Sequence, residues 1–556
     1  MIELTRRKTE PVTQGLLSQN AASGGLLGIV LVLALAVVVA AVAWPATMPW
    51  SFLALAGGAV LLYWSVRWEI TLWAWIWVLS YGLLDWPQWR IESSAFFTMT
   101  VPRFIFLVAM LAFGFYFLLH KERLRYDRAV IWVMLAFLVY CAISATITGW
   151  VAATMPSPAR GAPYFRFLGP IFFPFLIFFC VYNCTRDEKQ IRRLLILLSI
   201  YGWYALYIGY LQYAAIRGLD SARSLIWPAY INDPNLLLGH HFDRARGAFY
   251  ASNPQANLLL LLFYADLFLI RRMGVPKTRC IGFWGSLRGP YRIALIIQAV
   301  LIPPAIFFTG LRAAYLSFAV CGIVWCLWGC KGRLGKTKLA MAFLVAALAI
   351  IMFWGNIAQR GRAPSVGGAP ARIEHLRTER ATGGVAQTGP IITRMVLLAK
   401  TLDMVEISPL VGVGFGHFAE ADKKINRDPT SLGARSSAVT PISTPANLFA
   451  VMAAETGIIG LSLLVAIFIL IYRQSLQLYR RLPSEREALL SKDFVVVFWV
   501  AMTVYLVDAT FVDILWDVPS NGLFWAFAGL MVGYNRLMQS GAQNQPDLSV
   551  ASLNQE

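Results

Sequence analysis

Residues 102–128 read PRFIFLVAMLAFGFYFLLHKERLRYDR, and residues 129–148 continue with AVIWVMLAFLVYCAISATIT. Two apolar runs, each long enough to cross a bilayer as a helix, therefore flank a short basic loop. Similar runs recur along the 556-residue chain, near residues 25–44, 51–67, 69–86, 167–183, 194–214, 256–270, 291–309, 312–330, 338–355, 446–472, 493–513 and 520–536. The pattern predicts an all-α, polytopic transmembrane helical bundle of about 12–14 spans. The lower numbers apply if 51–67 or 312–330 is not a full crossing.

The composition excludes two broad classes of protein. Only 14% of the residues are charged, against about 25% in ordinary soluble domains, so the chain is not a water-soluble enzyme. Hydrophobic residues make up 58%, which excludes a largely disordered chain. The net charge of +19 lies partly in short loops between apolar runs, where the positive-inside rule explains it, so nucleic-acid binding is not indicated.

Basic loops alternate along the chain and predict its orientation. The loops rich in Lys and Arg are 121–128, 186–193, 271–292, 331–338 and 472–492. Because such loops stay on the cytosolic side, both termini are expected in the cytosol. The expected organisation is a cytosolic N-terminal segment at 1–24, transmembrane helices over 25–355 with an outer loop at 214–255, a large outer loop with helical segments at 356–444, further transmembrane helices over 445–538, and a cytosolic tail at 539–556.

Arginines on the expected outer face are informative, because they run against the positive-inside rule. Arg244 and Arg246 lie in the first long outer loop, and Arg312 lies in a two- or three-residue link between apolar runs. The planar guanidinium group binds phosphate oxygens bidentately, so the cluster favours a lipid-linked phosphate or pyrophosphate as ligand. The alternative is that these arginines pair with nearby acids such as Asp243 and with lipid headgroups.

Helix starts and intramembrane acids supply further candidates. Thr444 and Pro445 predict a helix start, with Thr444 as N-cap, whose free N–H groups would favour an anion on the outer face. Asp508 and Glu455 lie within apolar runs, where a carboxylate is a candidate functional group. Asp513 and Asp517 are also compatible with the membrane interface.

The segment from Gly412 to His417 predicts a turn rather than a dinucleotide site. Gly412-Val-Gly414-Phe-Gly416 has the wrong spacing for a dinucleotide fingerprint, and no strand precedes it. A tight turn with close backbone packing is expected, with His417 on the surface. The five His show no metal-ligand spacing, and the seven Cys no disulfide framework, so neither a metal nor a cofactor is expected.

Four stretches between about 240 and 460 resemble the superfamily of O-antigen ligases and O-antigen polymerases. These are Arg244-Ala-Arg-Gly-Ala-Phe249 with Asn253-Pro-Gln-Ala-Asn257, then Thr309-Gly-Leu-Arg312, then Arg394 to Gly414 ending in Pro409-Leu-Val-Gly-Val-Gly414, and finally Pro445-Ala-Asn-Leu448 with Ala454-Glu-Thr-Gly457. The order and spacing of the segments carry the resemblance, since none is specific alone.

The resemblance implies a glycosyltransferase of the bacterial inner membrane that works on the periplasmic side, where the 356–444 loop is then expected. It implies the use of undecaprenyl-pyrophosphate-linked sugars without a metal or nucleotide sugar. Matched residue by residue, the family's pyrophosphate-binding arginines fall on Arg244 and Arg312, with Arg246 as a substitute and Arg394 in the matched long-loop helix. The family's catalytic His falls on Ala446, which has no proton to move. Either this chain uses another base, for which Asp508 and Glu455 are candidates, or the His was replaced to block turnover.

Three functions remain open from the sequence. A polymerase would add O-antigen or exopolysaccharide repeat units, and a ligase would move finished glycan to lipid A core or to a protein. The polymerase is favoured weakly, with a flippase and a chain-length regulator as possible partners beside membrane lipid. A membrane transporter is less favoured, because the chain shows no pair of related halves with broken helices.

Overall fold

The computed structural model describes residues 71–83, 91–92, 98–120, 127–149, 166–217, 219–225, 244–249, 251–273, 283–329, 390–418, 421–422, 447–482, 489–511, 514 and 517–543. The expected runs at 25–44, 51–67 and 338–355 lie outside these residues, as do residues 1–24, residues 544–556 and Ala446. Every other expected run falls on a helix, and the prediction of an all-α polytopic bundle is confirmed. Within the described part, seven helices are long and apolar enough to cross a membrane, and three shorter apolar segments accompany them.

The chain divides into two compact units. The first comprises residues 1–77 and 91–125 and holds α4 (Val101–His120) and a short antiparallel pair, β1 (Ile91–Glu92) and β2 (Thr98–Met99). Helix α3 (Leu72–Leu83) contributes residues to both units. The second unit comprises residues 78–90 and 126–556 and contains every residue discussed below.

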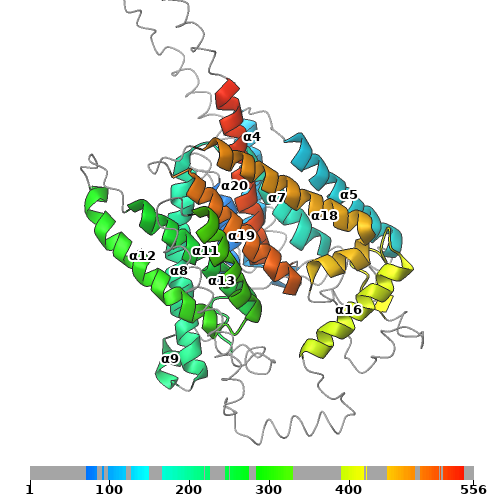
Figure 1. The fold of residues 1–556 in the computed structure, drawn as a ribbon, viewed down its shortest axis with the longest axis horizontal. Coiled ribbons are helices and arrows are strands. Elements are labelled where there is room, and N and C mark those ends of the chain that lie inside the picture. The colour runs from blue at the N-terminus through cyan, green and yellow to red at the C-terminus, as the bar shows by residue number, and fades with distance from the viewer. Residues whose placement is uncertain are drawn as a thin grey trace, which may run out of the picture. The chain divides into compact units, whose positions relative to one another are not determined.

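The second unit is built from long helices in sequence order. These are α5 (Arg128–Gly149), the π-helix η4 (Leu168–Phe172) with α7 (Phe173–Cys184), α8 (Glu188–Ile216), the short α9 (Asp220–Ser224), α11 (Ser252–Met273), α12 (Phe283–Phe308), α13 (Arg312–Val324) with η6 (Trp325–Gly329), α16 (Pro390–Ile407), α18 (Leu448–Arg481), α19 (Lys492–Phe511) and α20 (Val518–Gln543). Figure 1 shows these helices within the ribbon of the whole chain.

Apolar packing holds the C-terminal helices together. Helix α20 packs along α7, where Trp525 lies edge-on to Phe175 at 4.5 Å between ring centroids. Tyr505 of α19 stacks on Phe524 of α20 at 4.2 Å. Such aromatic pairs add about 0.5–1.5 kcal/mol each beyond the area they bury.

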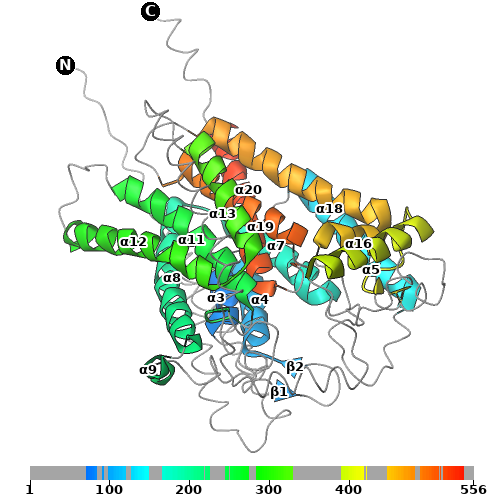
Figure 2. The same cartoon turned by 60° about the horizontal axis from the view of Figure 1, so that its bottom comes forward.

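Helix α16, within residues 356–444, packs against the first turns of α18. Both views show the two helices side by side (Figures 1 and 2). A fully buried apolar cluster lies between the two helices. It consists of Met404 of α16, Ala454 of α18, and Phe418 from the segment that follows α16. The helical segment expected within residues 356–444 is therefore present, and it is tied to the bundle.

Candidate functional site

The arginine segment 244–249 lies against the junction of α12 and α13. The backbone N–H of Ala245 donates to the Phe308 carbonyl at the end of α12, at 2.8 Å. Gly310 has a φ of +61°, and a Cβ there would lie 3.1 Å from Cγ of Arg244. The stem of Arg244 therefore packs on the turn that leads into α13, two residues before Arg312.

Arg312 is the first residue of α13 and is exposed, while Arg244 is partly exposed. The turn before Arg312 is fixed locally, because the Thr309 hydroxyl donates to the Ile306 carbonyl at 2.7 Å and accepts from the Leu311 N–H at 3.4 Å. The structure thus brings the two arginines that sequence reasoning paired to one helix–helix junction.

Gln212 of α8 holds the next residues of this segment. Its side-chain carbonyl accepts from the N–H groups of Arg246 and Gly247, at 3.0 and 2.8 Å, and its amide donates to the Gly247 carbonyl at 3.0 Å. Arg246 is buried, in contrast to Arg244 and Arg312. Arg394 falls within α16, but its side chain is outside the described residues.

Asp508 lies near the end of α19 in a buried chain of polar side chains. The Asn257 amide of α11 donates to Oδ2 of Asp508 at 2.8 Å and to the Ser520 hydroxyl at 3.1 Å. Ser520 donates in turn to Oδ2 of Asp517 at 2.7 Å. Oδ1 of Asp508 is buried and has no hydrogen-bond partner among the described residues. Three helices, α11, α19 and α20, therefore meet at one pair of carboxyl groups.

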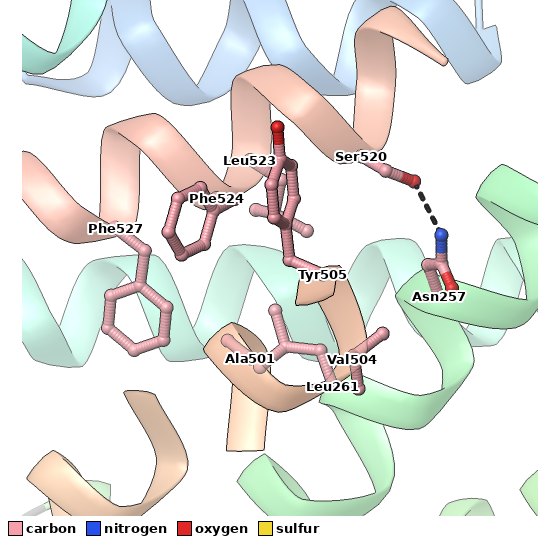
Figure 3. Close-up of a pocket in the computed structure, with 9 residues that line it drawn as sticks. All are labelled: Asn257, Leu261, Ala501, Val504, Tyr505, Ser520, Leu523, Phe524 and Phe527. Atoms are coloured by element: carbon pink, nitrogen blue, oxygen red, sulfur yellow. Dashed lines mark hydrogen bonds between the residues drawn. The ribbon is translucent and has the colours of Figure 1, made fainter. Parts of the chain in front are cut away.

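A small, mostly apolar cavity adjoins the hydrogen-bonded side chains of Asn257 and Ser520. Figure 3 shows the Asn257 amide directed at the Ser520 hydroxyl at one end, with the rings of Phe524 and Phe527 farther along. Asp517 is almost fully buried just before α20 begins. Burial raises the pKa of Asp517 to about 7, with a further upward contribution from the Asp508 carboxyl group, although its hydrogen bonds from Ser520 act in the opposite direction.

Asn447 joins the N-terminal end of α18 to the C-terminal end of α19. Asn447 is the N-cap of α18: its side-chain oxygen accepts from the Ala450 N–H at 3.0 Å, and its amide donates to the Thr510 carbonyl at 3.1 Å. The prediction of Thr444 as N-cap is therefore wrong. Asn447 takes the cap because the same amide also satisfies a free carbonyl of α19.

Glu455 is fully buried and anchored on both oxygens. Oε1 forms an ion pair with Arg166, whose exposed fraction is 1%, and Oε2 accepts from the Gly416 N–H at 3.0 Å. Removing one partner of a buried ion pair typically costs about 3–5 kcal/mol, because the other charge is left without compensation. Such contacts favour a positioning role over that of a proton acceptor, the role for which the sequence made Glu455 a candidate.

Residues 409–417, called the strap here, thread into a break in α18 at Gly457. The break has φ +63°, ψ −168°, and a Cβ on Gly457 would lie 2.2 Å from the Leu410 carbonyl oxygen. A Cβ on Gly412 would lie 2.4 Å from the Glu455 backbone carbonyl. The expected tight turn with close backbone packing is thus found, and glycine is required on both sides of the contact.

His417, at the end of the strap, is buried rather than on the surface, which corrects the expectation from sequence. Its Nε2 lies 3.5 Å from the Ala145 carbonyl of α5. The side chain is covered because the Phe415 N–H donates to the Ser144 hydroxyl at 3.0 Å, which draws this end of the strap onto α5.

A second buried ion pair lies away from the break and joins α16 to the residues that follow the strap. Lys400 of α16 pairs with Asp422 at 2.8 Å, and both residues are buried.

Among the described residues, no group of three or more His, Cys, Asp or Glu is arranged to hold a metal ion.

Sequence reasoning missed Arg166 and Gln212 and gave Asn257 no role of its own. Arg166 begins an apolar run at its expected outer end, so the positive-inside rule contains the signal that would have identified it. Gln212 lies inside the apolar run of α8, where an amide has to find a hydrogen-bond partner.

Residues 297–465 match the family model for O-antigen ligases. The match starts within α12, ends within α18 and includes Arg312, the strap and Glu455, whereas Arg244 and Asp508 lie outside it. It confirms the resemblance seen in the sequence over this stretch. No curated protein sequence matches the chain.

Proposed function

Because the chain is similar to O-antigen ligases over residues 297–465, we propose that it is a membrane glycosyltransferase whose donor is an undecaprenyl-pyrophosphate-linked glycan. The observation that carries the proposal is the junction at which the Arg244 stem packs on Gly310, two residues before Arg312. Two guanidinium groups on adjoining segments suit the two phosphates of such a donor. Arg246 and Arg394 are secondary candidates for the same role.

In the proposed reaction an acceptor hydroxyl attacks the anomeric carbon of the donor glycan. The new glycosidic C–O bond forms as the bond from the sugar to the pyrophosphate breaks, and undecaprenyl pyrophosphate leaves. Arg244 and Arg312 stabilise the charge that develops on the leaving group. The reaction needs neither a metal ion nor a nucleotide sugar.

Asp508 is the proposed acceptor of the hydroxyl proton. Asn257 fixes Oδ2 of Asp508, and the buried Oδ1 is then the oxygen available to a proton. The end of α19 also contacts Asn447, the neighbour of Ala446, at which the family has its His. Asp508 therefore lies two residues before Thr510, whose carbonyl Asn447 contacts. This proximity supports Asp508 as a base that replaces the family's His at position 446.

The donor is expected on the periplasmic face of the inner membrane, with both termini in the cytosol, because basic loops alternate along the chain. A single Cys introduced at the exposed Leu398 of α16 should react with an impermeant thiol reagent added from the periplasm. A Cys at Arg480, in a basic loop expected in the cytosol, should not react. The opposite labelling would invert the proposed orientation.

Polymerisation of O-antigen or exopolysaccharide repeat units is the favoured reaction, with a flippase and a chain-length regulator as partners. Glycan analysis of a strain lacking this chain tests it: a polymerase defect should leave single repeat units attached to lipid. Accumulation of long lipid-linked polymer would instead identify a ligase that transfers glycan to lipid A core or protein. Unchanged glycans in the deletion strain would count against both.

A further inference from the structure

The break in α18 leaves backbone groups that the strap satisfies. In an unbroken helix the carbonyls of Ala454 and Glu455 would accept from Ile458 and Ile459. Instead they accept from the N–H groups of Val413 and Gly414, at 2.8 and 2.9 Å. A polar backbone group without a partner is costly in a membrane, so the strap compensates directly for the break.

The exchange is reciprocal on the other side of Gly457. The N–H groups of Ile458 and Ile459 donate to the carbonyls of Pro409 and Leu410, at 2.9 and 3.3 Å. The Tyr140 hydroxyl of α5 donates to the Thr456 carbonyl at 2.8 Å. Backbone pairing alone thus joins the strap to both halves of α18.

The side chains of Arg166 and Glu455 close this contact. Glu455 belongs to the outer half of α18 and accepts from the Gly416 N–H of the strap. It is also ion-paired with Arg166, a helical residue two positions before η4. The guanidinium carbon of Arg166 also lies 5.8 Å from the centroid of the Phe415 ring. Arg166 therefore contacts the strap and the outer half of α18 at the same time.

We infer that Arg166 and Glu455 are positioning residues, which fix the strap and thereby aim the outer half of α18 at the reacting groups. That half-helix, Leu448–Thr456, starts at Asn447, whose amide contacts the end of α19 two residues after Asp508. A rotation at Gly457 would move Asn447 away from this end. The inference rests on the proposed function, since it concerns the placement of a transferase site.

Kinetics of purified Arg166→Gln and Arg166→Lys, measured with a lipid-pyrophosphate-linked oligosaccharide, test the inference. Arg166→Gln should lower kcat on the order of 10²-fold, because a displacement of about 1 Å is sufficient for such a loss. The dissociation constant for the donor should stay unchanged, since Arg244 and Arg312 supply the binding. Arg166→Lys keeps the charge beside Glu455 and should restore most of kcat.

Asp422→Asn is the matched control, because it breaks the Lys400–Asp422 pair, which is also buried, without touching the break in α18. It should leave kcat unchanged even where it lowers the melting temperature. Hydrogen–deuterium exchange should show faster exchange of the Val413, Gly414 and Gly416 amides in Arg166→Gln and unchanged exchange in Asp422→Asn.

Three results would overturn the inference: an unaltered kcat in Arg166→Gln, an equal loss of kcat in Asp422→Asn, or no rescue by Arg166→Lys. If Arg166→Gln does not fold, Glu455→Asp shortens the side chain, weakens the same contact and should give the same split between kcat and donor binding. A protein that exchanges as expected but transfers no glycan in its unmodified form would refute the proposed function and leave the strap contact standing.

Discussion

Arg312→Ala should abolish polysaccharide formation while the protein remains folded and inserted in the membrane. Removal of one group that stabilises developing charge typically costs about 10²–10³-fold in kcat, and here donor binding should weaken as well. Arg312→Lys should rescue poorly, because an ammonium group cannot make the bidentate contact of the planar guanidinium group. Consumption of donor lipid by the purified variants measures both effects.

Arg217→Ala is the control for this experiment. Arg217 also lies at the expected outer end of a helix, as the C-cap of α8, and its guanidinium group lies over the Tyr213 ring at 5.0 Å. Arg217→Ala removes one positive charge from the expected outer face, as Arg312→Ala does, and we expect near-normal turnover in Arg217→Ala. Full activity in Arg312→Ala would remove this residue from the mechanism.

Asp508→Asn should lower turnover by about 10²–10⁴-fold, the usual contribution of a general base. The substitution preserves size and still offers Asn257 a carbonyl oxygen, so the buried chain of polar side chains should keep its packing. Donor binding should change little, because the arginines remain. Single-turnover rates with bound donor separate the two quantities.

Asp266→Asn controls for the loss of a buried carboxyl group. Asp266 is as buried as Asp508 but lies nine residues beyond Asn257 along α11, away from the polar chain. Its substitution should leave turnover near normal.

Little or no gain in turnover is expected from Ala446→His. A rise of about 10²–10⁴-fold, with only a small loss in Asp508→Asn, would place the base at position 446.

Local hydropathy was sufficient to predict the apolar helices. The features that it missed depend on contacts between residues far apart in the sequence. The runs at 129–148 and 493–513 became α5 and α19, because about 20 apolar residues in lipid have few alternatives to a helix. The break at Gly457 was not predictable, because glycine is common within transmembrane helices and only the strap, about 45 residues earlier, makes this one a break. Pro445 predicted a cap at Thr444, and the hydrogen bond to the Thr510 carbonyl, which the sequence does not show, decides in favour of Asn447.

The candidate site divides along the same line. Arg244 and Arg312 were identified because positive charge on the expected outer face of a membrane protein is unusual, and the turn at Gly310 then joins them. Arg166 belongs to the same class of residue, but its partner Glu455 is 289 positions away. The role of Asn257 depends on a contact with Asp508 across 251 positions, which no local pattern encodes.

The most direct measurement of the central claim uses the unmodified protein in lipid vesicles with an undecaprenyl-pyrophosphate-linked oligosaccharide, with and without added lipid A core. The account predicts release of undecaprenyl pyrophosphate together with transfer of the glycan, either onto a second donor molecule or onto the lipid A core, and without a nucleotide sugar. Donor that stays intact with both acceptors, in the presence of folded protein, would contradict the account.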